Sequence, residues 1–238
     1  MNKKYTHLFF DLDNTLWDFK QNSKLTMEIT FHAFGIGNQN RTFDEFFDVY
    51  SEINHLLWAA YRKKEISKKE LTRKRFQLTF DQLQITGIDS DEMNSAYLAE
   101  MPKQKVLVPG TIDVLEYLKK ERYKLFIITN GFSEVQHKKL HSSGLAPFFE
   151  KVFISEELKC PKPGHLIFEH AIKSSNAKKG RSLMIGDDWD VDIIGALKFG
   201  IDSVYYSAEK RGIMNPRSNK YKNTLYCFTH LLELKTIL

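Results

Sequence analysis

The segment FFDLDNTLWDF, residues 9–19, places Asp11 and Asp13 at positions i and i+2 directly after an apolar run. In an extended segment these two side chains point the same way, because side chains alternate between the two faces of a strand. Two neighbouring carboxylates repel each other unless a cation lies close to both. The segment is therefore either an inert acidic turn or part of a cation site that other segments complete.

Beyond this segment, apolar runs typical of buried strands alternate with amphipathic stretches typical of helices. The strands are expected at YTHLFF (5–10), KLFIITN (124–130), KVFIS (151–155), SLMIGDD (182–188) and DSVYY (202–206). The helices between them are expected at residues 111–121, 133–144, 165–175 and 191–200. Such alternation predicts an α/β fold with a parallel sheet covered on both faces, and the first strand is expected to join that sheet.

Residues 22–101, between the first and second predicted strands, differ from the rest of the chain. Their apolar positions recur at helical spacing, and no convincing strand appears among them. The first of these helices has Asn22 or Ser23 as a candidate N-cap, and the second has Thr42 and Glu45 as a candidate capping box. Two further helices are expected near residues 67–85 and 90–101. This part of the chain is therefore predicted to be a helical insertion.

We predict two domains in the chain of 238 residues, which is long enough for a large core and a smaller companion. The interrupted α/β domain comprises residues 1–16 and 104–238, and the helical domain comprises residues 17–103. Hydrophobic residues make up 42% of the chain and charged residues 27%, which is typical of globular proteins rather than disordered ones.

The composition argues against exported, disulfide-bonded and membrane-spanning proteins. Cys160 and Cys227 are too few for a disulfide framework and belong to no metal-binding cluster, so we expect both to be reduced. No apolar run approaches the roughly 20 residues of a membrane-spanning helix, and residues 8–10 are too short for a signal peptide. We therefore expect a cytoplasmic protein. The net charge of +5 and the pI of about 9.0 are compatible with an anionic partner, from a phosphorylated metabolite to nucleic acid.

In an open α/β sheet, ligands bind beyond the carboxyl ends of the strands. Acidic and small polar residues end or directly follow three of the predicted strands: Asp11, Asp13, Thr129, Asn130, Asp187, Asp188, Asp190 and Asp192. Crowded carboxylates suit a hard cation such as Mg²⁺, which would remove the repulsion between Asp11 and Asp13. The same cation would let a phosphate dianion approach a carboxylate. The cation interpretation therefore points to phosphoryl chemistry.

These residue types can carry out phosphoryl transfer in two steps. A carboxylate nucleophile can take up the phosphoryl group as an acyl phosphate, which water then hydrolyses. A second acid two residues away can protonate the leaving oxygen and then deprotonate the water. A threonine hydroxyl, loop N–H groups and a lysine can hold the remaining phosphate oxygens. Thr129, Asn130 and Lys162 are available for this.

Four motifs, in order, make the sequence similar to the haloacid dehalogenase (HAD) superfamily of phosphatases. The DxDxT motif stands at residues 11–15 as DLDNT, and a hydrophobic strand ends in Thr129 within IITNG. The motif lysine is Lys162 within PKPGHLIF, and GDxxxxD stands as GDDWDVD with Asp187 and Asp192. The resemblance covers residues 7–200, and it implies a Rossmann-like HAD core with a helical cap inserted after the first strand.

The resemblance also implies roles for single residues. Asp11 is expected to be the nucleophile, and Asp13 the general acid and base. The expected phosphate-binding residues are Leu12, Thr129, Asn130 and Lys162. The expected Mg²⁺ ligands are Asp11, Asp13 through its carbonyl, Asp187 directly and Asp192 through a water molecule. The chain departs from the family pattern at Asp188, where many relatives have serine and whose role stays open, and at Gly164, which we expect to affect helix entry more than chemistry.

The long interval between Asp11 and Thr129 leaves room for a cap, and the continuation LWDFxxNS resembles a subgroup of pyrimidine 5'-nucleotidases. We therefore expect a Mg²⁺-dependent phosphomonoester hydrolase that acts on nucleoside monophosphates through an aspartyl phosphate. The alternatives are a sugar-phosphate phosphatase or phosphomutase, and a 2-haloacid dehalogenase, which would not need Asp13. Phe19 is the expected contact to the substrate on the cap side, where aromatic rings can stack a base.

The stretch RKKEISKKELTRKRF, residues 62–76, leaves open a binding module that uses its positive charge, but glutamates and apolar residues interrupt it. We expect a solvated face of the cap. The expected partner is a small phosphorylated metabolite rather than nucleic acid or a membrane, and the expected state is a monomer or a homodimer.

Overall fold

The computed structural model of the chain describes residues 3–208 and 222–238. The chain divides into two compact units. The α/β unit comprises Met1–Phe19 and Lys105–Leu238, and the helical unit comprises Lys20–Gln104. Their boundaries lie within a few residues of those expected from the sequence. In the described part of the chain, no helix is both long and apolar enough to cross a lipid bilayer.

The α/β unit is built on a parallel sheet with the strand order β3-β2-β1-β4-β5-β6. The strands are β1 (His7–Phe10), β2 (Lys124–Thr129), β3 (Lys151–Ile154), β4 (Ser182–Gly186), β5 (Asp202–Tyr206) and β6 (Leu225–Phe228). The predicted parallel sheet is confirmed, and β1 lies at its centre between β2 and β4. Strand β6 was not expected from the sequence, because its four residues are all half-buried and it pairs on one side only, at the edge of the sheet.

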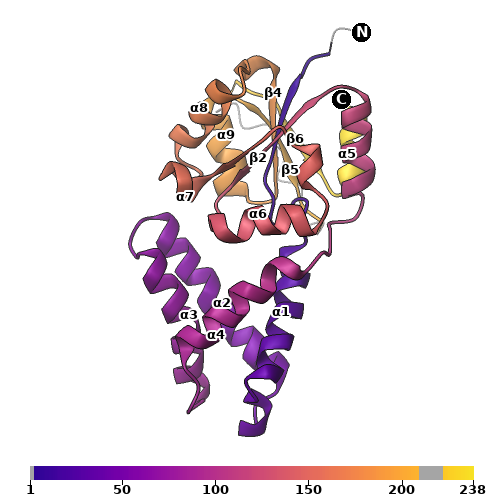
Figure 1. Cartoon of the computed structure of the whole chain (residues 1–238). Helices are drawn as coiled ribbons and strands as arrows, with labels where there is room; N and C mark the ends of the chain where they lie inside the picture. The colour runs from indigo at the N-terminus through magenta and orange to yellow at the C-terminus, as the bar shows by residue number, and fades with distance from the viewer. Residues whose placement is uncertain (1–2, 209–221) are drawn as a thin grey trace. The chain divides into compact units, whose positions relative to one another are not determined.

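Helices cover both faces of this sheet, and Figure 1 shows α8 and α9 on one side of the strands and α5 on the other. These helices are α5 (Thr111–Lys120), α6 (Ser133–Ser142), α7 (Ser155–Leu158), α8 (His165–Ser174) and α9 (Ile194–Phe199). One face of the sheet contributes Phe9, Phe126 and Met184 to a buried cluster with Phe168 of α8 and Ala196 of α9. Burial on both faces explains why the strands read as continuous apolar runs.

The helical unit contains the expected helices, but two of the predicted caps differ. Its helices are α1 (Phe19–Ala33), α2 (Phe43–Arg62), α3 (Lys68–Leu83) and α4 (Ser90–Glu100). Because α1 begins at Phe19, Asn22 and Ser23 lie inside the helix rather than at its N-cap, and that prediction is wrong. Both are buried, and the Ser23 hydroxyl lies 2.9 Å from the Tyr97 hydroxyl of α4. Packing between helices therefore uses these small polar residues.

Helix α2 begins with half of the predicted capping box. The Thr42 side chain accepts a hydrogen bond from the Glu45 backbone N–H, but the Glu45 carboxylate pairs with Arg41 instead of returning to the cap. A complete capping box stands at the start of α3, where Ser67 and Glu70 exchange hydrogen bonds. The Glu70 carboxylate also pairs with Lys74, so it offsets part of the positive charge of residues 62–76.

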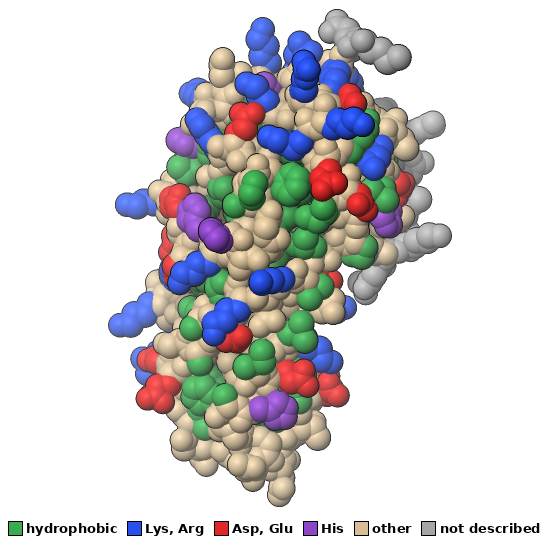
Figure 2. Space-filling model, turned by 45° about the vertical axis from the view of Figure 1, so that its right-hand side comes forward, with side chains coloured by type: hydrophobic (Ala, Val, Ile, Leu, Met, Phe, Trp, Pro, Cys, Tyr) green, Lys and Arg blue, Asp and Glu red, His purple; other side chains and the backbone are tan. Residues whose placement is uncertain are grey.

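The basic stretch 62–76 is not a continuous positive surface in the structure. The side chain of Arg75 is buried, with its guanidinium over the ring of Tyr97 and two hydrogen bonds to Asn94 Oδ1. Lys74 pairs with Glu70 at 3.2 Å. Over the face of the whole molecule drawn in Figure 2, Lys and Arg side chains are interspersed with Asp and Glu side chains.

Candidate active site

The carboxyl ends of β1, β2 and β4 bring the predicted residues together. The register pairs Phe10 of β1 with Ile127 of β2 and with Ile185 of β4, so the three strands end at nearly the same level. Asp11 continues β1 and donates its backbone N–H to the Ile185 carbonyl at 2.9 Å. Thr129 is the last residue of β2, and Asp187 follows β4 directly. Adjacency in the sheet therefore produces the site.

Lys162 is buried at the centre of this group. Its Nζ lies 2.5 Å from Asp11 Oδ1 and 2.6 Å from Asp192 Oδ1, and it donates to the Ile128 carbonyl at 2.7 Å. Its side chain is 1% exposed. A buried ammonium is stable only with partners of this kind. The lysine therefore holds the carboxylates of two separate segments together.

Asn130 fixes the segment that carries this lysine. Its Oδ1 accepts from the Lys162 backbone N–H at 2.9 Å, and its Nδ2 donates to the Lys162 carbonyl at 3.0 Å. Both functional groups of the side chain are thus used by the protein itself. A contact between Asn130 and phosphate would therefore involve its backbone.

Asp11, Asp187 and Asp192 form a cluster of acids suited to a cation. Each offers one carboxylate oxygen, and these oxygens lie within 4.8 Å of one another. Burial raises the pKa of Asp11 to about 8, although the Lys162 ammonium acts in the opposite direction. Burial, followed by repulsion from Asp11 and Asp192, raises the pKa of Asp187 well above its usual value. A donor set of crowded oxygens fits Mg²⁺, and the cation would relieve this repulsion.

A π-helix after β4 aims Asp192 into the cluster. This helix, η5 (Trp189–Ile193), precedes α9, so the helix expected at 191–200 begins earlier and in a wider form. Asp188 is its N-cap and accepts from the backbone N–H groups of Asp190 and Val191. The Asp188 backbone N–H in turn donates to Asp192 Oδ2 at 3.2 Å. The structure therefore gives Asp188 a capping role.

Gly186 leaves the space that Asp192 occupies. A Cβ added at this glycine would lie 2.4 Å from Asp192 Oδ2 and 2.6 Å from Asp192 Cβ, so the acid would have to move. We expect Gly186→Ala to lower turnover strongly and to reduce the free energy of unfolding by about 1–3 kcal/mol through overpacking. Gly180→Ala is the matched control, because a Cβ there meets open space. Steady-state rates and denaturant unfolding measure both effects; an unchanged rate in Gly186→Ala would contradict this role.

Asp13 is held by two residues of α6 that the sequence analysis missed. Lys139 Nζ donates to Asp13 Oδ1 at 2.7 Å, and Gln136 Nε2 donates to Asp13 Oδ2 at 2.9 Å. Gln136 Nε2 also donates to Thr129 Oγ1 at 2.7 Å. A signal was present, because Gln136 and Lys139 fall on the face of the predicted helix that also carries the apolar Leu140.

The other predicted residues lie in the turn after β1. The Leu12 side chain is buried, and its carbonyl accepts from the N–H groups of Leu16 and Trp17, which closes the turn. Thr15 donates to Asp187 Oδ1 at 3.0 Å and so ties this turn to the end of β4. The ring of Phe19 lies 5.2 Å from Lys139 Nζ. The structure therefore places Phe19 close to Lys139, one of the two residues that contact Asp13.

The sequence model of one protein family, the haloacid dehalogenase-like hydrolases, matches residues 5–200 of this chain. The chain belongs to this family. Among curated proteins, the hydrolase is 32% identical over 209 residues to the pyrimidine 5'-nucleotidase PynA of Streptococcus pneumoniae. This alignment covers 85% of this chain and 84% of PynA. It is 30% identical over 214 residues to the pyrimidine 5'-nucleotidase YjjG of Escherichia coli, which covers 87% of this chain and 88% of YjjG.

A solved structure supports the same assignment. YfnB of Bacillus subtilis, bound to magnesium, superposes with a TM-score of 0.85 at 27% identity over 99% of both chains. The fold and the family expected from the four motifs are therefore confirmed, and the protein is an enzyme of the hydrolase class.

Proposed function

We propose that this hydrolase is a Mg²⁺-dependent phosphomonoesterase that acts on nucleoside 5'-monophosphates through an aspartyl phosphate. The observation that carries the proposal is the cluster of Asp11, Asp187 and Asp192 around Lys162, with Asp13 beside it. It combines a nucleophile, an acid and a cation site at one edge of the sheet. The similarity to two pyrimidine 5'-nucleotidases supports the choice of substrate.

The metal would be held by Asp11 and Asp187, by the Asp13 carbonyl and, through water, by Asp192. When bound, Mg²⁺ supplies positive charge that reduces the repulsion between a phosphate dianion and the attacking carboxylate. Lys162 adds a fixed positive charge beside Asp11 and lies close enough to hold the phosphate as well.

Asp11 performs the bond-forming step. Its carboxylate attacks phosphorus, the bond between phosphorus and the leaving oxygen breaks, and Asp13 gives its proton to that oxygen. The Thr129 hydroxyl and the backbone N–H groups of Leu12 and Asn130 hold the phosphoryl oxygens. In the second step water attacks the phosphoryl group on Asp11, and Asp13 takes the proton. Inorganic phosphate leaves and the free carboxylate is restored.

A substrate panel with Mg²⁺ tests this proposal. Pyrimidine nucleoside monophosphates, purine nucleoside monophosphates, sugar phosphates and 2-chloropropionate are compared by phosphate or chloride release. We expect kcat/KM for the best pyrimidine nucleotide to exceed that for sugar phosphates by about 10-fold or more, since one specific binding contact contributes roughly that factor. Preferred turnover of a sugar phosphate would contradict the nucleotide assignment, and chloride release would contradict the phosphatase assignment.

Preparations with Asp11→Asn serve as the blank for contaminating phosphatases. A sugar phosphate isomerised instead of hydrolysed would identify a phosphomutase, because the phosphoryl group would then return to the substrate.

Replacement of Phe19 by Ala completes the panel. We expect it to change the ratio between nucleotide and sugar phosphate rates, because base stacking contributes about 1–3 kcal/mol.

A further inference from the structure

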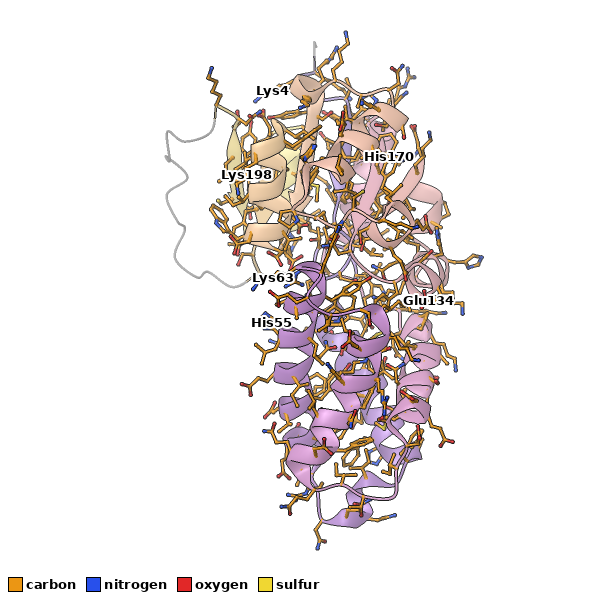
Figure 3. All side chains as sticks on the ribbon, turned by 90° about the vertical axis from the view of Figure 1, so that its left-hand side faces the viewer. Lys4, His55, Lys63, Glu134, His170 and Lys198 are labelled. Atoms are coloured by element: carbon orange, nitrogen blue, oxygen red, sulfur yellow. The ribbon has the colours of Figure 1, made fainter. Side chains whose placement is uncertain are left out.

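Helix α6 buries two polar side chains on the face that it turns toward the active site. Gln136 is fully buried and Lys139 is 3% exposed. They are three residues apart, so they lie on the same side of the helix. Glu134 and Lys138 of the same helix are exposed, and Figure 3 labels Glu134. The helix thus buries two polar side chains where apolar residues would pack without desolvation cost.

Lys139 contacts Asp13 and the aromatic rings beside it. Burial of an ammonium costs several kcal/mol unless the charge is paired. Asp13 Oδ1 lies 2.7 Å from its Nζ, and the Trp17 and Phe19 ring centres lie 4.1 Å and 5.2 Å away. These rings accept a cation on their faces and fix where the ammonium can be. The position of Lys139 therefore limits the orientations of the Asp13 carboxylate.

Gln136 connects Asp13 to Thr129. Its Nε2 donates to both Asp13 Oδ2 and Thr129 Oγ1, while within the described residues its Oε1 is buried without a hydrogen-bond donor. An unsatisfied buried acceptor costs about 1–3 kcal/mol, so this arrangement is unfavourable for the fold by itself. The Thr129 oxygen also accepts from the Gly131 N–H at 3.3 Å. With two donors aimed at it, the Thr129 hydroxyl must direct its own proton elsewhere.

We propose that Gln136 and Lys139 are positioning residues for phosphoryl transfer, which hold the Asp13 carboxyl group in one orientation and leave the Thr129 proton for a phosphoryl oxygen. This inference rests on the proposed phosphomonoesterase function. Lys139 acts on Asp13 alone, whereas Gln136 acts on Asp13 and Thr129 together. The two residues therefore have separable kinetic effects.

The effect of Lys139 depends on the leaving group. An alkoxide such as the nucleoside oxygen needs a proton from Asp13, whereas p-nitrophenolate leaves without one. We expect Lys139→Met to slow release of the nucleoside by about 100-fold and release of p-nitrophenol by less than about 5-fold, since misplacement of a catalytic group by about 1 Å costs this much. The rates are measured in single turnovers with Mg²⁺ and enzyme in excess, so that only the first chemical step is observed.

Replacement of Gln136 is expected to weaken substrate binding as well as to slow the chemical step. We expect Gln136→Met to lower kcat on the nucleotide and to raise KM as well, because Thr129 loses a fixed orientation toward phosphate. Lys139→Met should leave KM near the value of the unchanged enzyme. Lys139→Arg keeps the charge, and we expect it to recover at least about 10-fold of the rate lost in Lys139→Met.

Lys138→Met is the matched control, because it removes the same charge from an exposed position of the same helix. Thermal unfolding checks that each variant is folded, and Lys139→Gln replaces Lys139→Met if the latter is not. If nucleotides are not the best substrates, the fastest alkyl phosphate of the substrate panel is used.

The outcomes separate this inference from the proposed function. A rate loss in Lys139→Met that is large with the alkyl phosphate and small with p-nitrophenyl phosphate supports a positioning role. Equal losses with both leaving groups, or rates equal to those of Lys138→Met, would overturn it while the proposed function stands. Absence of phosphatase activity in the unchanged enzyme, or retained activity in Asp11→Asn, would overturn the proposed function and this inference with it.

Discussion

Replacement of Asp11 by Asn is expected to lower turnover by at least about 10⁴-fold while the protein stays folded. The amide has nearly the same shape as the carboxylate but cannot form the acyl phosphate. Lys162 keeps its contacts to Asp192 and to the Ile128 carbonyl, so the core around it remains satisfied. Phosphate release at saturating substrate measures the loss, and thermal unfolding measures the stability.

The matched control for this variant is Asp190→Asn, which makes the same chemical change at an exposed position of the π-helix η5. We expect the control to keep most of the rate. A second readout is covalent labelling, because the unchanged enzyme should trap a phosphoryl group on Asp11 after an acid quench and Asp11→Asn should not. Substantial turnover by folded Asp11→Asn would exclude Asp11 as the nucleophile.

Removal of divalent cations is expected to abolish turnover, and Mg²⁺ to restore it. Without a cation, the phosphate dianion meets the carboxylates of Asp11, Asp187 and Asp192, of which Lys162 pairs with Asp11 and Asp192. Repulsion between like charges at such distances is worth several kcal/mol even at an effective dielectric constant of about 20. Full activity after exhaustive chelation would contradict the cation site.

A binding measurement tests the same site independently of turnover. A ligand that binds the native state alone at 100 times its Kd stabilises it by about 2.7 kcal/mol, so Mg²⁺ should raise the melting temperature of the metal-free protein. We expect this rise to be lost in Asp187→Asn and kept in Asp190→Asn. An equal rise in both variants would place the cation elsewhere.

The sequence was sufficient to predict most of the fold and the acidic residues that lie together at the edge of the sheet. Strands buried on both faces read as apolar runs, so β1, β2, β4 and β5 were found from their composition. The edge strand β3 was found from the shorter apolar stretch VFI at residues 152–154. Because the carboxyl ends of parallel strands share one edge, Asp11, Thr129 and Asp187 could be placed together without coordinates. Lys162 was found from its motif, and the structure shows the carboxylates it contacts.

The residue roles that were not predicted from the sequence depend on contacts between elements that are distant along the chain. Gln136 and Lys139 belong to a helix that was predicted, but their partner Asp13 lies more than a hundred residues earlier. Ser23 looked like a cap because small polar residues are common there, whereas its contact with Tyr97 appears only when the helices pack. Side-chain partners across the fold could not be deduced from spacing along the chain.

The buried Lys162 at the candidate active site also sets the formal charge that a bound ion would have to balance. The carboxylates of Asp11, Asp187 and Asp192 lie close to one another, and the Lys162 ammonium contacts those of Asp11 and Asp192. When all four groups are ionised, two negative charges are in excess. A divalent ion would neutralise this excess, whereas a sodium or potassium ion in the same place would leave one net negative charge. The amino acid composition of the site therefore favours ions of valence two before size or geometry is considered.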